Sequence, residues 1–448
     1  MWLLLDCAYG IAGLACLPLL VYQRFVLGKR RGGWRQRFGR LPPRKAGPPC
    51  IWIHAVSLGE TNATRGIVEA IRKELPDREV VISTTTDTGY ARAKELYPDL
   101  YVFRYPLDFS WVVRRVLDTI RPAVIVLMEL EVWPNLVLLA SDRGIAVAVA
   151  NGRLTEERTM RRFRKPVVRR LARRMFGRLA WVGAQNATYA ERFRELGVPA
   201  DRLHVTGLLK WDTAQVADTL PGTEALRTAT GIAVRGPHTP DGDRPFLWVC
   251  GQTGPGEEEV VLDAYRLLRE RWPAMQLAVI PRKPERFDEV ARLIAKQGWS
   301  YVRRSEHPDG AGPPAGRPDV ILGDTMGELR KFYCLADVVF VGRSLVPMGG
   351  SDVVEVAALA RPIIVGPHTE NFADSVAELR AAGAIVVCPT GADDPAAART
   401  LAELVAGLLT GEAAGAMGLA ARRVVQENQG VTQRTVTALV DLVNRAQH

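Results

Sequence analysis

The chain has 448 residues, of which 47% are apolar and 24% are charged. This length exceeds what one hydrophobic core usually supports and suits two domains of about 200 residues each. The composition excludes a disordered tail protein, a collagen-like repeat and a polytopic membrane protein. No CxxC pair occurs among the six cysteines, which argues against a zinc ribbon or a disulfide framework and suits a reducing compartment.

Positive charge is concentrated in two segments of the chain. The net charge is +10, but residues 28–45 hold eight Lys or Arg and no acid, and residues 158–178 hold ten and no acid. The rest of the chain is therefore mildly acidic and carries −8. Two local basic patches predict contact with a polyanion, either nucleic acid or an anionic membrane.

Residues 3–22 form an apolar run that is long enough to cross a bilayer and contains one charge, that of Asp6. No base precedes this run and several follow it, so the positive-inside rule keeps the body of the protein in the cytoplasm. We predict a membrane anchor over residues 1–27 that either spans the bilayer or lies in its interface. The alternative is a buried helix of the first domain, which Asp6 and Pro18 favour.

The second basic segment, residues 158–178, has apolar residues between its bases. Nucleic-acid readers usually present stacking aromatics or a recognisable module, and we find neither here. The segment therefore predicts contact with a membrane or an acidic substrate, or else a solvated helix face. We expect no nucleic-acid partner.

After residue 50, two series of short apolar runs alternate with helical patterns. Their continuous hydrophobicity predicts strands buried on both faces, as in a parallel sheet with crossover helices. We therefore predict an α/β fold with two Rossmann-like parallel-sheet domains that face a cleft, over residues 28–212 and 246–448. Residues 213–245 are rich in Gly, Pro and Thr and form the predicted linker, and residues 394–447 are predicted to be helical. The predicted strands are 51–55, 80–84, 101–105, 123–128, 145–150, 180–183 and 203–206, then 246–250, 277–280, 320–322, 338–341, 362–365 and 384–387.

Charged side chains follow three strands of the first series. Glu60 lies in the first turn of a predicted helix, where it either acts as a general base or caps the helix. Glu129 and Glu131 end a buried strand, where carboxylates are either functional or held in an ion pair. Lys210 closes the first domain, and either faces a leaving phosphate or is a hinge lysine.

Loops at strand ends of the second series predict a nucleotide site. Arg282 can hold a phosphate with its planar guanidinium. Residues 323–329 and 342–355 lead into helices whose first N–H groups can bind an anion, and Glu355 suits a ribose diol. The absence of a P-loop and of a complete GxGxxG argues against a kinase, an ATPase or a dehydrogenase. We predict no metal site, because the DxD-like residues 241–243 lie in the linker and not at a strand end.

The motifs taken together resemble the bacterial 3-deoxy-D-manno-octulosonic acid (Kdo) transferases. They are, in the family's order, HAVSLGE, MELEVWPN, NGRL, TGLLKWD, PRKPERF, LGDTMGEL and VGRSLVPMGGSDVVEVAALARPIIVGPHTENF. The resemblance covers nearly the whole chain and implies a GT-B fold with an N-terminal acceptor-binding domain and a C-terminal donor-binding domain. It also implies an inverting transfer of Kdo from CMP-Kdo to the lipid A precursor, at the cytoplasmic face of the inner membrane and with no metal or other cofactor.

The resemblance assigns a role to individual residues. Glu60 matches the catalytic base of the family, and Glu131 and Lys210 match positions that stabilise the transition state. The residues that match the CMP-binding segments are Pro281, Arg282, Met326, Gly327, Glu328, Asp352, Val353, Val354 and Glu355. The chain departs from the family at Lys283, at Ser351 and Asp352, and in the loop 251–256, all on the donor side.

Two other functions stay open on the residues alone. One is a different GT-B transferase that uses a UDP-sugar on a lipid acceptor, and the affinity for cytidine against uridine nucleotides separates it from a Kdo transferase. The other is a non-catalytic, membrane-tethered nucleotide binder, against which the retained Glu60 argues.

Overall fold

The computed structural model forms two compact units, which are described separately here. Unit 1 comprises Met1–Thr213 together with Asn428–His448, and unit 2 comprises Ala214–Glu427. The structure describes residues 2–26, 32–45, 47–155, 159–233, 245–308, 310, 312, 316–411 and 413–445. Part of each basic segment and the DxD-like residues 241–243 lie outside these ranges.

Unit 1 is built on a seven-stranded sheet of order β3-β2-β1-β4-β5-β6-β7, in which every neighbouring pair is parallel. The order reverses between β1 and β4, as in a doubly wound Rossmann sheet. The strands are β1 (Cys50–Ala55), β2 (Val80–Thr84), β3 (Tyr101–Arg104), β4 (Pro122–Met128), β5 (Ala146–Gly152), β6 (Trp181–Ala184) and β7 (Leu203–Val205).

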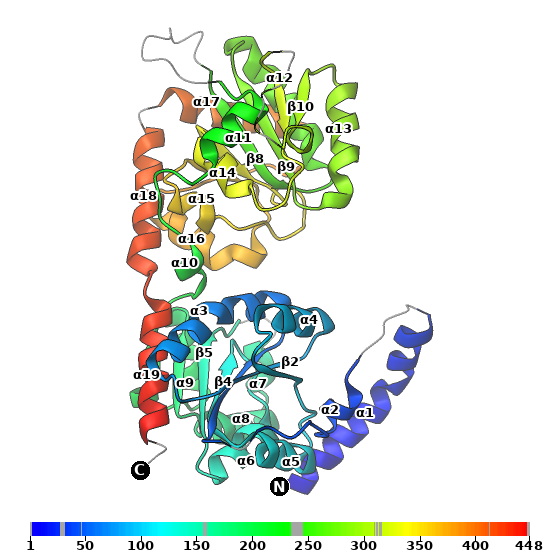
Figure 1. The fold of residues 1–448 in the computed structure, drawn as a ribbon, viewed down its shortest axis with the longest axis vertical. Helices are drawn as coiled ribbons and strands as arrows, with labels where there is room; N and C mark the ends of the chain where they lie inside the picture. Colours follow the sequence, from blue (N-terminus) through cyan, green and yellow to red (C-terminus); the bar gives the residue numbers. More distant parts are fainter. Residues whose placement is uncertain are drawn as a thin grey trace. The chain divides into compact units, whose positions relative to one another are not determined.

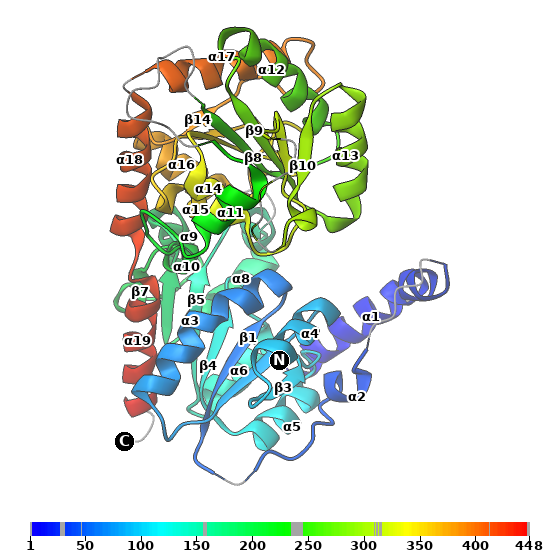
Figure 2. The same ribbon diagram turned by 45° about the horizontal axis from the view of Figure 1, so that its top comes forward.

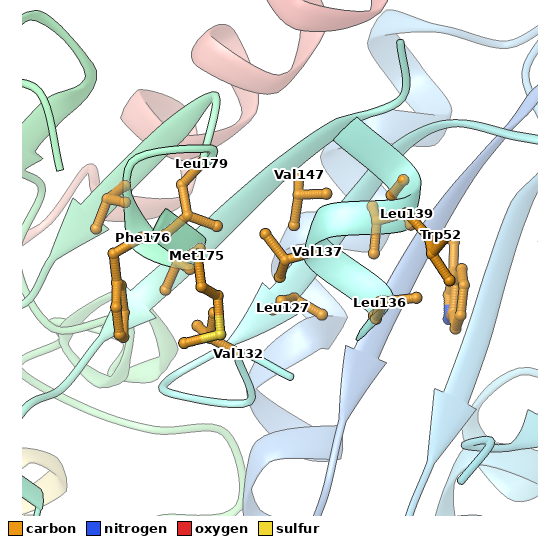
Figure 3. Packing of buried hydrophobic residues seen from close by; sticks show 14 of the residues in the cluster. Trp52, Leu127, Val132, Leu136, Val137, Leu139, Val147, Met175, Phe176 and Leu179 are labelled. Carbon is orange, nitrogen blue, oxygen red and sulfur yellow. The ribbon is translucent and has the colours of Figure 1, made fainter. Parts of the chain in front are cut away.

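Helices cover both faces of this sheet, which explains why its strands are apolar throughout rather than alternating (Figure 1). The helices of unit 1 are α1 (Trp2–Phe25), α2 (Trp34–Arg37), α3 (Leu58–Glu74), α4 (Asp87–Leu96), α5 (Ser110–Ile120), α6 (Pro134–Asp142), α7 (Arg161–Phe163), α8 (Pro166–Phe176), α9 (Ala187–Glu195), α10 (Lys210–Thr213) and α19 (Val431–Arg445). One apolar cluster joins the sheet to α5, α6, α8 and α9, and the other joins it to α3, α4 and α19. In Figure 3, side chains of α6 and α8, among them Val137 and Met175, pack against Leu127 and Val147 of the strands.

The C-terminal helix α19 belongs to unit 1, so the prediction that residues 246–448 form one domain is wrong from Asn428 onward. Val431 and Leu439 are fully buried in the cluster beside α3. Asp212 accepts hydrogen bonds from the backbone N–H groups of Gly430 (2.7 Å) and Thr432 (2.5 Å) at the start of the helix. The amphipathic pattern of α19 indicates a buried face, but it does not say which sheet that face covers.

Unit 2 repeats the doubly wound plan with a parallel sheet of order β10-β11-β9-β8-β12-β13-β14. Its strands are β8 (Leu247–Thr253), β9 (Gln276–Pro281), β10 (Tyr301–Arg303), β11 (Val320–Leu322), β12 (Val338–Val341), β13 (Ile363–Val365) and β14 (Val386–Val387). Its helices are α11 (Thr223–Thr230), α12 (Glu257–Arg271), α13 (Phe287–Lys296), α14 (Leu329–Leu335), α15 (Val354–Ala358), α16 (Ala373–Ala381), α17 (Ala397–Thr410) and α18 (Ala413–Asn428). Helices α12 and α17 lie side by side over one face (Figure 2).

The predicted linker 213–245 is folded in its first part. Residues from Ala214 onward belong to unit 2, and α11 buries Leu226 and Ala229. Gly222 and Gly231 flank this helix with positive φ angles of 80° and 67°, which is why the sequence around it has the composition of a loop. The prediction that residues 213–245 form an interdomain linker is therefore wrong for residues 214–232, which are part of unit 2.

Helix α1 is long and apolar enough to cross a membrane, and it is the one described helix that meets this test by itself. Its exposed residues include every position from Ile11 to Leu19. The structure therefore supports the predicted apolar N-terminal helix.

Candidate functional site

The predicted catalytic carboxylates of unit 1 lie where the strand order reverses. Glu60 follows β1, and Glu129 and Glu131 follow β4, the neighbouring strand. Ligands of doubly wound sheets bind at the carboxyl ends of the two strands that flank this switch point. The fold therefore brings together acids that are 69 to 71 positions apart in the sequence.

Glu60 closes a reciprocal cap at the start of α3. The N-cap residue Ser57 donates its hydroxyl hydrogen to Oε1 of Glu60 (2.9 Å) and accepts the Glu60 backbone N–H (3.3 Å). Oε2 of Glu60 accepts the N–H of Val56 (2.9 Å). This arrangement is a variant of the capping box, in which the carboxylate accepts the N–H of Val56 rather than that of the N-cap residue, and it fixes the rotamer of a half-buried carboxylate. Each oxygen still has a lone pair with which to accept a proton.

Glu129 and Glu131 lie close enough to Glu60 for its negative charge to raise the pKa of both carboxyl groups. Burial and, to a smaller extent, the charges of Glu60 and Glu131 raise the pKa of Glu129 to about 7, and the opposing charge of Arg153 is already included in this value. Burial also raises the pKa of Glu131, and a hydrogen bond from the indole of Trp133 (2.9 Å) partly offsets this effect. Glu129 has a φ of 56°, a conformation that non-glycine residues seldom adopt and that is common at functional sites.

A buried aromatic pair supports the same end of the sheet. His54, the fifth residue of β1, stacks on Tyr105 with ring centroids 3.7 Å apart. Its Nδ1 lies 2.9 Å from Oγ of Ser83, and full burial lowers the pKa of the imidazole to about 3. His54 is therefore neutral at physiological pH and acts as a packing residue, so the His of the HAVSLGE motif is not a candidate acid.

Lys210 is half-buried at the first residue of α10. This helix packs against α3, the helix that begins near Glu60. The preceding Leu209 donates its N–H to Oδ1 of Asn151 (3.1 Å), a residue with a φ of 55° at the end of β5. The NGRL and TGLLKWD motifs thus meet through this bond, which fixes the backbone that carries Lys210.

A buried carboxylate occupies the switch point of unit 2, between β8 and β12. Glu257 is fully buried and accepts four backbone N–H groups, those of Gly254 (2.8 Å), Arg343 (2.5 Å), Ser344 (2.8 Å) and Leu345 (2.8 Å). The N–H groups of residues 343–345, at the start of the Gly-rich stretch that leads into the predicted nucleotide site, therefore hold a side chain of the protein itself. Burial raises the pKa of Glu257 and these hydrogen bonds lower it in part.

The predicted donor-binding residues lie on separate loops at the carboxyl edge of this sheet. Arg282 directly follows β9, is exposed, and donates its backbone N–H to the carbonyl oxygen of Thr253 (3.0 Å). Pro281 is buried as the last residue of β9, and Met326 is 70% exposed on the loop after β11. Gly327 has a φ of 84°, which lets that loop turn back toward α14.

Glu328 is held by its own neighbours. It accepts a hydrogen bond from Thr325 Oγ1 (2.6 Å) and pairs with Arg304 (2.9 Å) and Lys331 (3.2 Å). Burial raises the pKa of Glu328, but these three partners outweigh burial and lower the pKa overall. Its carboxylate therefore shapes the loop, and the exposed backbone of Met326 and Gly327 is what the loop offers to a ligand.

The segment Asp352, Val353, Val354 and Glu355 forms the start of α15. Oδ1 of Asp352 accepts the N–H of Val354 (3.0 Å), a local turn that sets the entry to the helix. Asp352 and Glu355 are both half-buried. The pKa of the Tyr333 hydroxyl is raised mainly by its full burial, and the charges of Glu355 and Asp352 add to this rise. A side chain at Gly251 would collide with the Tyr333 ring, with a Cβ only 2.5 Å from Cε1.

The structure thus gathers the predicted site residues into two groups, one in each unit. It also adds Glu257, which the sequence prediction left out, and it brings Glu129, for which the sequence left a functional role or an ion pair open, beside Glu60. The strand-end position of Glu129 is visible in the MELE motif, whereas three of the four partners of Glu257 lie 86 to 88 positions away and leave no local signal. Among the side chains that the structure describes, no group of three or more His, Cys, Asp or Glu residues is arranged to hold a metal ion.

Comparisons with known proteins identify the family. The family model of the 3-deoxy-D-manno-octulosonic-acid transferases (kdotransferases) matches residues 32–213. The 3-deoxy-D-manno-octulosonic acid transferase of Haemophilus influenzae is 32% identical, over 96% of this chain and 97% of the relative. That of Bordetella pertussis is 34% identical, over 97% of this chain and 98% of the relative.

Solved structures agree on the fold. The UDP-GlcNAc 2-epimerase from Neisseria meningitidis, solved with UDP-GlcNAc, covers 88% of this chain and all of its own length with a TM-score of 0.55. At 14% identity this likeness concerns the GT-B-like arrangement of two parallel sheets alone. With two relatives similar over nearly their full lengths, the chain belongs to the 3-deoxy-D-manno-octulosonic acid transferase family and is a glycosyltransferase.

Proposed function

We propose that the protein transfers Kdo from CMP-Kdo to the lipid A precursor, an anionic phosphoglycolipid, with inversion at the anomeric carbon. The observation that carries this proposal is the cluster of Glu60, Glu129 and Glu131 at the switch point of unit 1. Family membership supports Kdo as the transferred sugar. CMP as the leaving group and the glycolipid as acceptor rest on the resemblance and on the chemistry of the two units.

In the proposed reaction, Glu60 accepts the proton of the acceptor hydroxyl. The oxygen so activated bonds to the anomeric carbon of Kdo, while the bond from that carbon to the phosphate oxygen breaks and CMP leaves with the electron pair. The capping box supports this role, because a base must be held within hydrogen-bond reach of the hydroxyl. Glu131 and Lys210 stabilise the positive charge of the sugar ring and the negative charge of the phosphate, respectively.

In unit 2, we assign donor binding to Pro281 and Arg282, to the loop of Met326, Gly327 and Glu328, and to the segment from Asp352 to Glu355. Arg282 is exposed at a strand end, and a guanidinium there can pair with the phosphate of CMP. CMP has one phosphate, so protein cations can balance the charge that a diphosphate leaving group often shares with a metal ion. The carboxylates of Asp352 and Glu355 suit the ribose hydroxyls.

We place the reaction at the cytoplasmic face of the inner membrane. Helix α1 supplies an apolar anchor. Helix α8, in the second basic segment, can supply a second contact with the membrane. Its residues Ala172, Met175 and Phe176 pack on the core, while Arg169 and Arg173 are exposed to solvent. Such a basic face attracts an anionic bilayer or an acceptor with phosphate groups.

The direct experiment is an assay with purified protein, CMP-Kdo and the lipid A precursor, in which the product mass is measured. We expect the acceptor to gain the mass of one or more Kdo residues and CMP to be released. Absence of product with CMP-Kdo, together with product from a UDP-sugar, would favour the other GT-B transferase. Nucleotide binding without product from either donor would favour a non-catalytic protein.

A further inference from the structure

The first turns of α1 are attached to unit 1 by polar contacts. Asp6 accepts hydrogen bonds from the backbone N–H of Ser110 (2.8 Å), the Ser110 hydroxyl (2.6 Å) and the side-chain amide of Asn135 (3.1 Å). Tyr9 donates its hydroxyl hydrogen to Asp108 (2.9 Å), a residue that is 8% exposed. The Asp6 carboxylate that weakens a membrane-spanning helix is therefore satisfied by the body of the protein.

The other carboxylate of this contact is part of the body itself. Oδ1 and Oδ2 of Asp108 accept the backbone N–H groups of Leu136 (2.8 Å) and Asn135 (2.9 Å) at the start of α6. Ser110 is the first residue of α5, so Asp6 and Asp108 together satisfy the N-terminal N–H groups of two helices. We call the contacts of Asp6 and Tyr9 with Asp108, Ser110 and Asn135 the polar clamp.

A helix held in this way is too short to span a bilayer with its remaining residues. Residues 10–26 follow the clamp, and at 1.5 Å per residue they extend about 26 Å, less than the roughly 30 Å of the hydrocarbon core. If residues 2–9 also lay in the core, the clamp would take Ser110 and Asn135 into the hydrocarbon with them. Figures 1 and 2 show that α1 meets unit 1 near its N-terminal end, and that its C-terminal end points away from the sheet.

An exposed row of aromatic side chains continues from the clamp over the surface of unit 1. The Tyr9 ring packs edge-on against Phe109, with ring centroids 6.0 Å apart. Phe109 stacks on Trp111 (6.3 Å), and Trp111 stacks on Phe38 (6.2 Å). Phe38 is in turn 6.2 Å from Trp34 on α2. Trp34, Phe38 and Trp111 are 45%, 38% and 47% exposed, so large aromatic faces point to solvent. Trp residues concentrate at the interface between lipid tails and water.

Basic side chains border this row. The guanidinium of Arg115 lies 5.7 Å from the Trp111 ring centre, and Arg35 lines a pocket of about 490 Å³ together with Trp34 and Tyr90. The charge of Arg162, in the second basic segment, acts on the Tyr9 hydroxyl, which places that segment near the clamp. Aromatic faces bordered by arginines match the headgroup region of an anionic bilayer.

We propose that α1 lies in the membrane interface on the cytoplasmic side and does not span the bilayer. The polar clamp keeps the first turns of α1 on unit 1. The apolar residues of α1 from Ile11 onward enter the cytoplasmic leaflet just below its headgroups, and the row of Trp34, Phe38 and Trp111 lies at the headgroups. This inference rests on the proposed membrane association and goes beyond it, because it fixes how the body meets the lipid. It also keeps the acidic cluster near the bilayer surface, where the headgroup of a lipid acceptor is found.

The position of residue 3 relative to the membrane distinguishes an interfacial helix from a span. Leu3 is 79% exposed, the natural thiols Cys7 and Cys16 are exposed, and the other four cysteines are buried. We would introduce Leu3→Cys into the full chain with Cys7 and Cys16 replaced by Ala. A membrane-impermeant maleimide is then applied to intact spheroplasts and to inverted inner-membrane vesicles.

An interfacial α1 predicts labelling of Leu3→Cys in inverted vesicles without detergent and protection in intact spheroplasts. A control on the body of the protein, Glu259→Cys on the exposed face of α12 in unit 2, should behave in the same way. Labelling of Leu3→Cys in spheroplasts, or protection in inverted vesicles until detergent is added, would overturn the proposal. Absence of the protein from the membrane fraction would instead contradict the proposed membrane association.

A second measurement tests the aromatic row. The double variant Phe38→Ala with Trp111→Ala should bind vesicles that contain phosphatidylglycerol at least about threefold more weakly than the natural chain, since binding scales with the apolar area inserted. The control is Tyr301→Ala, which removes an equally exposed aromatic side chain of unit 2. Equal binding by the natural chain and the double variant would remove the row from the interface.

Discussion

Ser57 and Glu60 exchange hydrogen bonds at the start of α3, with Ser57 Oγ donating to the carboxylate at 2.9 Å and accepting the Glu60 N–H at 3.3 Å. The sequence left two roles open for Glu60, a helix cap and a general base. The structure contains the cap, and this does not remove the second role, because the cap orients the carboxylate at the switch point beside Glu129 and Glu131. The two roles can be separated by changing one partner at a time.

Glu257→Gln should strongly destabilise unit 2. A Gln side chain offers one acceptor oxygen in place of two and turns an N–H₂ donor toward backbone donors, so buried N–H groups lose their partner. We expect a loss on the order of 3 kcal/mol. Urea unfolding followed by circular dichroism measures it, and the control is Glu259→Gln, an exposed acid in the same first turn of α12. Equal stability of the two variants would show that the four hydrogen bonds contribute little.

The stability of unit 1 should fall as the pH rises through the range in which Glu129 titrates. Burial and the Glu60 charge raise the pKa of Glu129 from 4.5 to about 7, so the folded state binds its proton more tightly than the unfolded state does. The contribution of Glu129 to the free energy of unfolding is therefore largest below pH 4.5, and it is lost as the pH rises to about 7. The half-buried position of Glu129 reduces the effect to on the order of 1 kcal/mol.

Glu129→Gln tests this dependence, since an amide does not titrate. Unfolding midpoints at pH 5 and pH 8 should differ less for the variant than for the natural chain. Parallel changes in both proteins would mean that Glu129 has an ordinary pKa in the folded state.

Asp212→Ala should loosen the C-terminal helix from unit 1. The substitution removes the acceptor for the N–H groups of Gly430, Val431 and Thr432, and loss of a capping side chain costs about 1 kcal/mol. Hydrogen exchange of the α19 amides measures the effect, with Asp441→Ala on the exposed face of α19 as control. Unchanged exchange in Asp212→Ala would show that the apolar contacts of Val431 and Leu439 are sufficient by themselves.

The sequence predicted the sheets well, because strands that are buried on both faces are continuously apolar and stand out from helices. Predicted strand 80–84 agrees with β2 at both ends, and 338–341 agrees with β12. Strand β10 was missed, since Tyr301 is exposed and Arg303 is polar, as is usual at the edge of a sheet. The long helical stretch 394–447 is three helices, which end at Thr410, Asn428 and Arg445.

The candidate site was predicted less completely, for a physical reason. Glu60, Glu131 and Arg282 lie beside strand ends, and a strand end is visible in the sequence. The polar clamp joins Asp6 to residues 110 and 135, and Glu257 binds N–H groups almost ninety positions away. Such long-range hydrogen bonds depend on the folded backbone, so no local sequence pattern predicts them.

The most direct test of the account is the pair Glu60→Gln and Ser57→Ala, compared for Kdo transfer and for CMP affinity. Gln keeps the size of the side chain but cannot act as a base, so transfer by Glu60→Gln should fall by about 10² to 10⁴, with CMP affinity nearly unchanged. Ser57→Ala removes the cap partner and keeps the carboxylate, so it should lose about 1 kcal/mol of stability and retain most of its activity. Near-normal transfer by Glu60→Gln would contradict the assignment of Glu60 as the base and leave it a helix cap alone.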